Sequence, residues 1–252
     1  MLLLALDTTT AAGSVALWRD GLVEERAGDA ARSHAERLPG ELAALLTAHG
    51  LAVRDVERYA VAAGPGSFTG IRIGIATVQG LALVDDRLVH AVGTLDLLAH
   101  DAARAADAEA GTTIVVWMEA YRGEVFAARY RIAQAAAHEA GDAGPRRRGA
   151  ARLDVLDPPT VSAPEPLAQA WAGGTGRIIV SGDGVARTAG LLAAAFGADA
   201  ALRAPGALAG TLAALAARQP DAATRPHAVM PIYGRRPDVE LARDRAAVRP
   251  TA

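Results

Sequence analysis

The sequence predicts an α/β protein of two similar lobes, each with mixed strands in a βββαβα order and helices flanking the sheet. Two observations carry this prediction. Apolar runs of strand length alternate with longer amphipathic segments along the chain, and the order of three strands, helix, strand and helix occurs approximately twice. We expect an N-terminal lobe of residues 1–93 and a C-terminal lobe of residues 94–252.

The first lobe is expected to open with strands at residues 2–6, 14–18 and 22–26, the last two joined by an Asp20-Gly21 turn. Ser33 and Glu36 have the spacing of a capping box, which predicts a helix that Gly50 ends. A strand at residues 58–63 follows.

A glycine-rich turn at residues 64–74 leads directly into an apolar helix at residues 70–84. Gly64, Gly66 and Gly70 permit backbone angles that a Cβ disfavours, so the sequence specifies this turn closely. Because the helix is aliphatic on almost every face, it must be buried on more than one side. Gly74, Ala76 and Gly80 would let a second helix approach closely.

The second half repeats the order after a bridge formed by residues 88–92 and a helix at 94–108. Its expected strands are residues 112–118, 124–132, 152–156 and 177–181, and its expected helices are 166–171, 185–196 and 207–218. Residues 133–151 read as a surface insertion, whose run of three arginines fits a solvated loop better than an RNA contact. The tail after Tyr233 is expected to be irregular.

Composition narrows the function further. The chain has 252 residues, 51% of them hydrophobic, and a formal net charge of −2, which gives no overall attraction to nucleic acid. Because it contains no cysteine, disulfides and thiolate metal sites are excluded. The apolar run at residues 2–6 is too short for a secretory or membrane-spanning segment, so we expect a cytoplasmic protein without membrane contact.

Several motifs resemble those of the TsaB (YeaZ) family. They are the sequences at residues 4–10, 14–17, 33–39, 64–74, 79–82, 122–126 and 231–233. The resemblance touches most of the chain, and residues 64–74 are its most specific part. Residues 119–121 depart from the family's usual Asp-Ala-Arg. The resemblance implies the fold of the actin-like ATPase (ASKHA) superfamily, with two ribonuclease-H-like lobes.

The resemblance also implies a function. TsaB is a non-catalytic partner of TsaD, the subunit that transfers a threonylcarbamoyl group to N6 of the anticodon-adjacent adenosine in tRNAs reading codons that begin with A. We therefore expect a heterodimer with TsaD, engagement of the ATPase TsaE, tRNA contact mainly through the complex, and a homodimer in isolation. No cofactor is expected to be required, although weak ATP or ADP binding with Mg²⁺ at a degenerate site or beside TsaE remains compatible.

In the superfamily, a phosphate loop follows the first strand, and its carboxylate positions hydrated Mg²⁺. The corresponding residues are Asp7, Thr8 and Thr9, with Thr8 in place of the usual glycine, so we expect weak or degenerate nucleotide binding. A second remnant is expected at Gly182, Asp183 and Gly184. Both segments also fit ordinary turns at strand ends.

No catalytic or metal site is expected. The resemblance implies that TsaD holds its metal with two histidines four residues apart on a helix. This chain has no histidine pair with that spacing; its six histidines are at positions 34, 49, 90, 100, 138 and 227. His34 is expected to be a surface or capping residue, and Ser67 a cap of the following helix. The alternative of a glycoprotease-type peptidase lacks chemical support in the sequence, since no nucleophile has a recognisable base.

The helices at residues 33–49 and 70–84 are predicted to form the partner surface. The expected anchors, with Arg72 at the rim, are Leu38, Leu42, Leu45, Ile71, Arg72, Ile75 and Val78. The alternative is that half of these side chains point toward the sheet. The alternative function is an independent ATP-dependent phosphotransferase or hydrolase, which the fold also permits.

Overall fold

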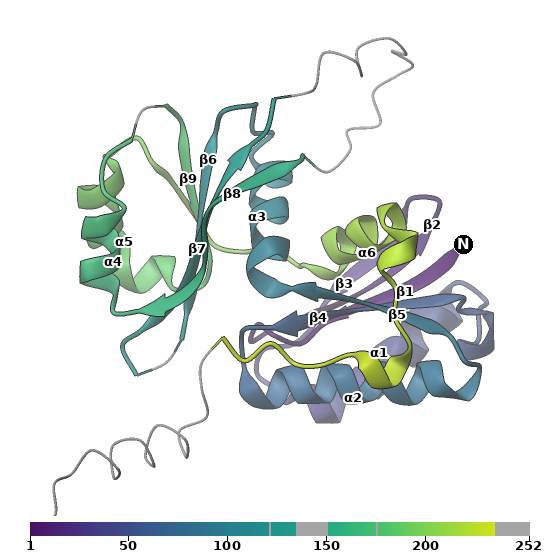
Figure 1. Cartoon of the computed structure of the whole chain (residues 1–252). Helices are drawn as coiled ribbons and strands as arrows, with labels where there is room; N and C mark the ends of the chain where they lie inside the picture. The colour runs from purple at the N-terminus through teal and green to yellow at the C-terminus, as the bar shows by residue number, and fades with distance from the viewer. Residues whose placement is uncertain (121, 135–150, 175, 235–252) are drawn as a thin grey trace, which may run out of the picture.

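A computed structural model describes residues 1–120, 122–134, 151–174 and 176–234. The first lobe is a five-stranded mixed sheet in the order β3-β2-β1-β4-β5 (Figure 1). Strands β1 to β3 form an antiparallel meander, and β4 and β5 continue parallel to β1. Their bounds are β1 (Leu2–Asp7), β2 (Ser14–Arg19), β3 (Leu22–Ala27), β4 (Arg58–Gly64) and β5 (Leu88–Gly93).

One face of this sheet is covered by α1 (His34–Ala48) and α2 (Phe68–Val84). The predicted capping box is confirmed, because the Glu36 amide donates to Ser33 Oγ and the Ser33 amide donates to the Glu36 carboxylate. Leucines from β1 and α1 and isoleucines from α2 fill the layer between helices and sheet. The short 3₁₀ turn η1 (Val53–Asp55) precedes β4.

The second lobe repeats this arrangement. Its sheet has the order β10-β9-β6-β7-β8, in which β6, β7 and β8 form the antiparallel meander and β9 and β10 run parallel in the same direction as β6. The bounds are β6 (Thr113–Glu119), β7 (Val125–Ile132), β8 (Leu153–Ser162), β9 (Ile178–Ser181) and β10 (Ala201–Arg203), with α4 (Pro164–Ala170) and α5 (Val185–Phe196) on the outer face. The predicted duplicated α/β architecture is confirmed.

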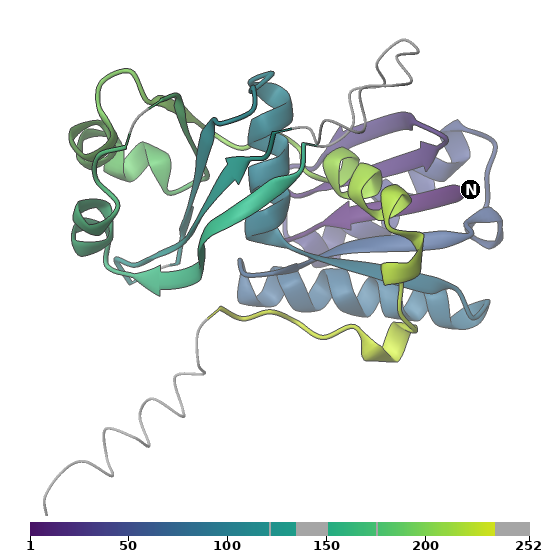
Figure 2. The same cartoon turned by 45° about the horizontal axis from the view of Figure 1, so that its top comes forward.

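Two helices cross between the lobes. Helix α3 (Thr94–Ala105) leaves the first lobe and packs on β6, β7 and β9, whereas α6 (Ala209–Arg218) leaves the second lobe and packs on β1 and β2. Figure 2 shows both helices in the layer between the two sheets. One buried cluster therefore runs through both lobes, including Leu3, Leu97, Ile114 and Leu212. The boundary expected at residue 93 separates the two sheets along the chain. It does not separate all the helices, because α6 follows the second sheet in sequence but packs on the first.

After α6 the chain stays on the first lobe through two 3₁₀ turns, η2 (Pro220–Ala222) and η3 (Pro226–Ala228). Gln79 of α2 donates to the carbonyls of Pro226 and Val229 at 3.0 and 3.2 Å. The Ile232 amide donates to the Ala63 carbonyl at 2.7 Å. We call residues 224–234 the C-terminal strap, because they tie α2 and the end of β4 together (Figure 2).

The structure corrects several sequence expectations. Residues 88–93 form the fifth strand of the first sheet rather than a bridge, and β10 was not predicted. Strand β8 continues to Ser162 through Pro158 and Pro159, which an edge strand tolerates because it has one unpaired side. The expected insertion at 133–151 lies mostly, and the tail almost entirely, outside the described residues. Within the described part, no helix is long and apolar enough to cross a membrane.

Candidate functional site

The loop after β1 is closed by its own hydrogen bonds. Asp7 is 1% exposed, and its carboxylate accepts from the Thr9 amide at 2.8 Å, from Thr9 Oγ1 at 2.5 Å and from Thr10 Oγ1 at 2.9 Å. A buried carboxylate needs such donors, and here the loop itself supplies them. In this arrangement both oxygens of Asp7 are engaged within the loop.

The glycine-rich turn before α2 packs directly against the loop that follows β1. Thr8 Oγ1 donates to the Gly70 carbonyl at 2.8 Å, and the Ser67 amide donates to the Thr9 carbonyl at 3.0 Å. A Cβ at Gly66 would lie 2.6 Å from the Thr9 carbonyl oxygen, and one at Gly70 would lie 2.0 Å from that of Thr8. The glycines are therefore required by close approach of two backbones.

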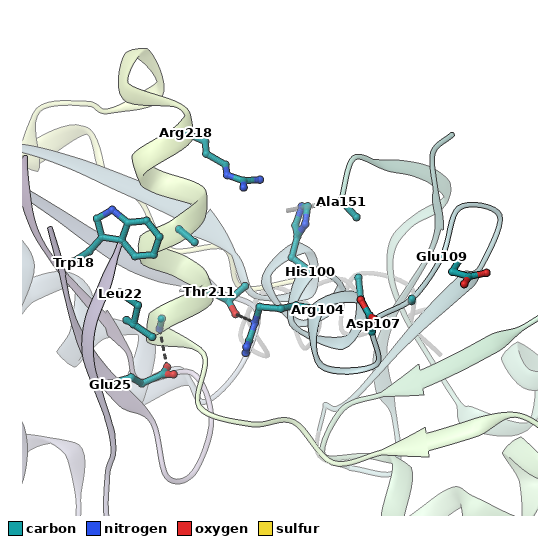
Figure 3. A pocket seen from close by; sticks show the side chains of 14 residues that line it. Trp18, Leu22, Glu25, His100, Arg104, Asp107, Glu109, Ala151, Thr211 and Arg218 are labelled. Carbon is teal, nitrogen blue, oxygen red and sulfur yellow. Dashed lines mark hydrogen bonds between the residues drawn. The ribbon is translucent and has the colours of Figure 1, made fainter. Parts of the chain in front are cut away.

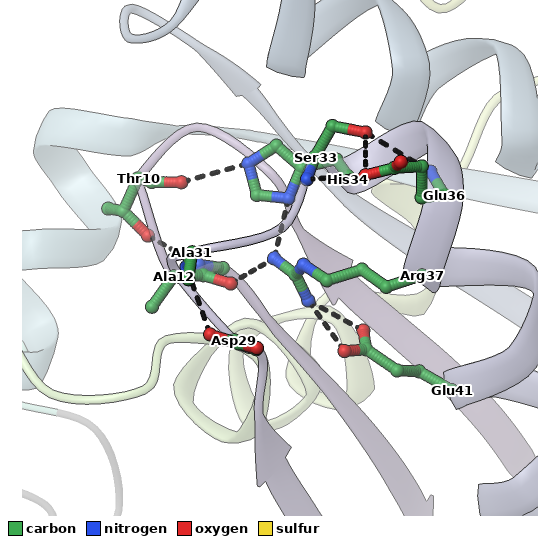
Figure 4. Close-up of polar contacts among 10 residues, drawn as sticks. Thr10, Ala12, Asp29, Ala31, Ser33, His34, Glu36, Arg37 and Glu41 are labelled. Atoms are coloured by element: carbon green, nitrogen blue, oxygen red, sulfur yellow. Dashed lines mark hydrogen bonds and ion pairs between the residues drawn. The ribbon is translucent and has the colours of Figure 1, made fainter.

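Helix α1 fixes the other side of the same loop (Figure 4). His34 Nε2 lies 3.1 Å from the Thr10 carbonyl oxygen, and its Nδ1 lies 2.6 Å from Arg37 Nη2. Arg37 also donates to both oxygens of Glu41 at 2.7 Å and to the Ala12 carbonyl. Burial and the neighbouring guanidinium lower the pKa of His34, which favours the neutral ring that these contacts require.

Arg37 supports this loop, and the sequence analysis did not single it out. Its side chain is buried, and it passes through space left by a glycine, because a Cβ at Gly28 would lie 1.6 Å from Arg37 Nη1. The available signal was the i, i+4 spacing of Arg37 and Glu41 on α1, combined with Gly28 opposite. His34, expected as a surface or capping residue, instead has both ring nitrogens engaged.

The second predicted loop adopts a tight turn between β9 and α5. Gly182 has φ +144°, and a Cβ there would lie 2.2 Å from the Trp117 carbonyl oxygen. Asp183 Oδ1 accepts from the Glu119 amide at 2.8 Å, and the Gly184 amide donates to the Trp117 carbonyl at 3.1 Å. The Asp183 carboxylate and the Gly184 amide of this loop are thus bonded to the backbone of β6.

The two loops face one cavity of about 250 Å³ between the lobes, lined by residues including Thr9, Thr10, Ser67, Glu119 and Asp183. The structure therefore brings together residues from both predicted nucleotide loops. The cavity is smaller than the roughly 300–1,000 Å³ typical of ligand pockets. Nucleotide binding at this cavity, weak or otherwise, therefore stays a prediction.

A larger cavity of about 690 Å³ lies between α3 and α6, where β2 and β3 border them (Figure 3). Trp18 and Glu25 of the first lobe line it together with Arg104 of α3. Glu25 accepts from the Gly210 amide at 2.7 Å, and Arg104 donates to Thr211 Oγ1 at 3.3 Å. Burial raises the pKa of Glu25 although the Gly210 hydrogen bond opposes that shift. These groups hold α3 and α6 in place.

The predicted partner surface needs correction. All six aliphatic anchors are buried within the chain itself, with exposed fractions of 0–6%; they are Leu38, Leu42, Leu45, Ile71, Ile75 and Val78. They lie on the faces of α1 and α2 that cover the sheet, because a spacing of three and four residues places them on one side of each helix. The alternative of inward-pointing side chains therefore applies to all six, not half.

The outer faces of α1 and α2 carry small and apolar side chains instead. We call them the small-residue surface: on α1 it comprises Ala35, Gly40, Ala43, Ala44 and Thr47, and on α2 Ala76, Gly80, Leu83 and Val84. Leu83 and Val84 are 69% and 79% exposed. A Cβ at Gly40 or Gly80 would meet no atom within 4 Å. Gly74, expected to admit another helix, instead packs against Thr8.

Arg72 precedes this surface on α2 and is exposed, so its role at the rim of an interface stays a prediction. Its guanidinium stacks on Phe68 at 3.9 Å from the ring centroid, and its Nε donates to Tyr233 Oη at 2.9 Å. Phe68 and Tyr233 lie 5.2 Å apart between centroids. Arg72 therefore links the start of α2 to the C-terminal strap.

Comparison with known proteins identifies the family. Residues 26–245 match the family model described as TsaD, tRNA N6-adenosine threonylcarbamoyltransferase. The chain is 40% identical over 131 residues to the tRNA threonylcarbamoyladenosine biosynthesis protein TsaB of Escherichia coli K12, covering 52% of this chain and 55% of that protein. The corresponding TsaB of Haemophilus influenzae is 37% identical over 124 residues, covering 49% and 51%. The chain thus spans about half the length of the curated relatives it matches.

Similarity to a solved structure extends over nearly the whole chain. A crystal structure of an uncharacterized protein with similarity to peptidase YEAZ, from Pseudomonas aeruginosa, superposes with a TM-score of 0.75 at 30% identity. The match covers 93% of this chain and 99% of that one. The two lobes, the motifs and these matches agree, and the chain belongs to the TsaB (YeaZ) branch of the tRNA N6-adenosine threonylcarbamoyltransferase family.

Proposed function

We propose that this chain is a non-catalytic scaffold and activator subunit in the synthesis of threonylcarbamoyladenosine in tRNA. It binds TsaD through the small-residue surface, and TsaE joins through that heterodimer. Because the substrate is tRNA, we assign the chain to the cytoplasm. In the absence of TsaD, two copies of the chain pair through the same surface.

The observation that carries this proposal is the small-residue surface itself. Alanines and glycines on the outer faces of two adjacent helices allow a partner's helices to approach closely, and the distance between packed helices depends on the side chains at the contact. Exposed Leu83 and Val84 add apolar area that a partner removes from water. Arg72, beside Phe68 and Tyr233, lies at the rim.

The cleft chemistry supports a non-catalytic role. Both carboxylate oxygens of Asp7 accept hydrogen bonds from its own loop, and both ring nitrogens of His34 contact other protein groups. In the described part of the chain, no cluster of three or more histidines and carboxylates could hold a metal ion. Transferase chemistry is therefore assigned to TsaD.

The interface is tested with two glycines of similar surroundings. Gly80 of α2 lies on the small-residue surface, whereas Gly190 of α5 lies on the second lobe, and a Cβ at either would meet no atom within 4 Å. We expect Gly80→Arg to weaken TsaD binding by at least about tenfold, because the long side chain holds the helices apart. Gly190→Arg should bind TsaD normally. Affinities are measured by titration calorimetry.

Neither substitution is expected to impair folding, so a difference in TsaD affinity between the two variants reports on the interface. Arginine is favoured over glycine in an exposed helix by roughly 0.5–1 kcal/mol, so both variants should be at least as stable as the parent chain. Equal TsaD affinities for the two variants would refute the interface. Sedimentation of the chain alone should show that Gly80→Arg is monomeric and that Gly190→Arg is still dimeric.

A reconstitution separates the scaffold from the alternative ATP-dependent enzyme. Threonylcarbamoyladenosine should form with TsaD, TsaE and this chain together, and the Asp7→Ala variant should support its formation if it remains folded. Tight Mg-ATP binding by the isolated chain that is lost in Asp7→Ala would favour the independent enzyme instead. Mg-ATP binding is measured by fluorescence with a labelled ATP analogue.

A further inference from the structure

The outer face of the second sheet changes character where its helical cover ends. Beneath α4 and α5, the strand positions facing the helices are buried and apolar, as at Val125 and Ala127 of β7. The next positions on the same face of β7 are Arg129 and Arg131, because alternate residues of a strand share a face. Beside the ends of α4 and α5 this face forms a hollow of about 300 Å³.

One of the two arginines is held in place. Arg129 donates from Nε to Asp157 Oδ2 at 2.6 Å and from Nη1 to the Trp171 carbonyl at 3.3 Å. Its guanidinium carbon also lies 5.1 Å from the centroid of the Trp171 ring. These contacts explain Arg129 as a structural residue and fix the direction of its guanidinium.

The other arginine has no such explanation. Arg131 is exposed and lines the hollow, and no hydrogen bond or ion pair joins its side chain to any residue that the structure describes. Its neighbours in register are Thr113 of β6 and Asp154 of β8. Asp154 has another cationic partner, since Arg152 Nη2 lies 3.5 Å from its Oδ1.

The lining of the hollow is therefore rich in donors and poor in free acceptors. It contains two guanidinium groups and the hydroxyl of Thr113, against the single carboxylate of Asp157, which Arg129 already engages. Counted over its lining alone, the hollow has two cationic groups and one carboxylate, in a chain whose formal net charge is −2.

We propose that this hollow binds a phosphate group, with Arg131 as its main cationic contact and Thr113 as a hydroxyl donor. Guanidinium matches phosphate because its planar N–H groups donate two parallel bonds to two oxygens. The same phosphate chemistry is presented by a free nucleotide and by the backbone of RNA. This site does not depend on the proposed scaffold function, and it lies on the lobe opposite the small-residue surface.

The test is a titration of the full chain, labelled for NMR, with inorganic phosphate against sodium chloride of equal ionic strength. Phosphate should shift the amides of Thr113, Arg131 and Gly174, which lines the same hollow. We expect Arg131→Gln to weaken phosphate binding by about tenfold or more, as loss of a charge-assisted pair implies. Thr113→Val should weaken it less.

The matched control is Arg19→Gln, which removes one exposed arginine from the first lobe and leaves the same net charge. It should bind phosphate as the parent does. Absence of phosphate-specific shifts in the parent, or equal losses in Arg131→Gln and Arg19→Gln, overturns the site. Parallel titrations with 5′-AMP and with a short RNA lacking terminal phosphates identify the source by which of them binds more tightly.

Discussion

At the scale of single residues, several polar side chains of the cleft already have hydrogen-bonding partners within the chain. Asp7, His34 and Arg37 have hydrogen-bonding partners in the loop after β1 or in α1. Two other histidines lie in the packing between the lobes, where burial leaves His90 Nε2 and His100 Nδ1 without a partner among the described residues. Such surroundings disfavour the charged form of an imidazole, because it loses hydration without gaining a partner.

These histidines give a pH dependence with a definite sign. Burial, together with Arg58, lowers the pKa of His90; burial and Arg218 lower that of His100, although Asp96 opposes the shift. In the unfolded chain both protonate near pH 6.5, so the unfolded state takes up protons first as pH falls. The free energy of unfolding should therefore decrease between pH 7.5 and 5.5, as measured by urea titration. His90→Leu should reduce that decrease, and an unchanged decrease would contradict the assignment.

At the scale of elements, α2 has two faces with different roles. Its inner face rests on the loop after β1 through Gly70 and Gly74, whereas Gly80 on its outer face meets nothing within 4 Å. The strap holds the middle of the helix through Gln79. The helix is therefore fixed on one side and available on the other.

Two alanine substitutions in α2 should have opposite effects on stability. Gly70→Ala places a Cβ 2.0 Å from the Thr8 carbonyl oxygen, and we expect it to destabilise the chain by about 1–3 kcal/mol. Gly80→Ala should stabilise it by about 0.5–1 kcal/mol, because alanine restricts the unfolded chain and favours the helix. Urea unfolding of both variants checks this. Shifts in the same direction would contradict the description of the two faces.

The sequence predicted the elements better than their surroundings. Cap and turn chemistry located α1 and the glycine turn, since these signals are local. The apolar residues of α1 and α2 were recognised from the sequence, but what covers them was not, so Leu38 and Ile75 were assigned to a partner although the sheet buries them. Burial of α2 on more than one side was also expected, whereas Leu83 and Val84 are exposed. Strand β10 has only three residues, too few for a periodic signal. The spacing of Arg37 and Glu41 was visible on α1, but the close approach of Arg37 to Gly28 depends on tertiary packing, which no local pattern encodes.

At the scale of the whole molecule, α3 and α6 join the lobes reciprocally. Each helix follows one lobe in the chain and covers the sheet of the other, and one buried cluster includes residues from both sheets. Neither lobe therefore has a complete core without the other. The similarity of the two halves in sequence order does not make them independent folding units.

We expect the two lobes to unfold together. Trp18 reports on the first lobe, and Trp117 and Trp171 report on the second; these are all three tryptophans of the chain. Trp18→Phe leaves the second-lobe reporters, and the double variant of Trp117 and Trp171 to phenylalanine leaves the first-lobe reporter. Circular dichroism gives the thermal unfolding midpoint of each variant and so accounts for any change in its stability. Within each variant, the midpoint from tryptophan fluorescence should agree with the midpoint from ellipticity within about 2 °C. Separate fluorescence and ellipticity transitions would contradict this.

The C-terminal strap has a consequence for handling the protein. Because Gln79 donates to the Pro226 and Val229 carbonyls and the Ile232 amide donates to the Ala63 carbonyl, the last described residues support the helix whose outer face we propose as the partner surface. Cutting the chain before Pro226 removes these bonds without altering any residue of α2. A shortened chain would then lose partner binding through a poorly supported helix, and affinity tags and truncations are best designed to leave residues 224–234 intact.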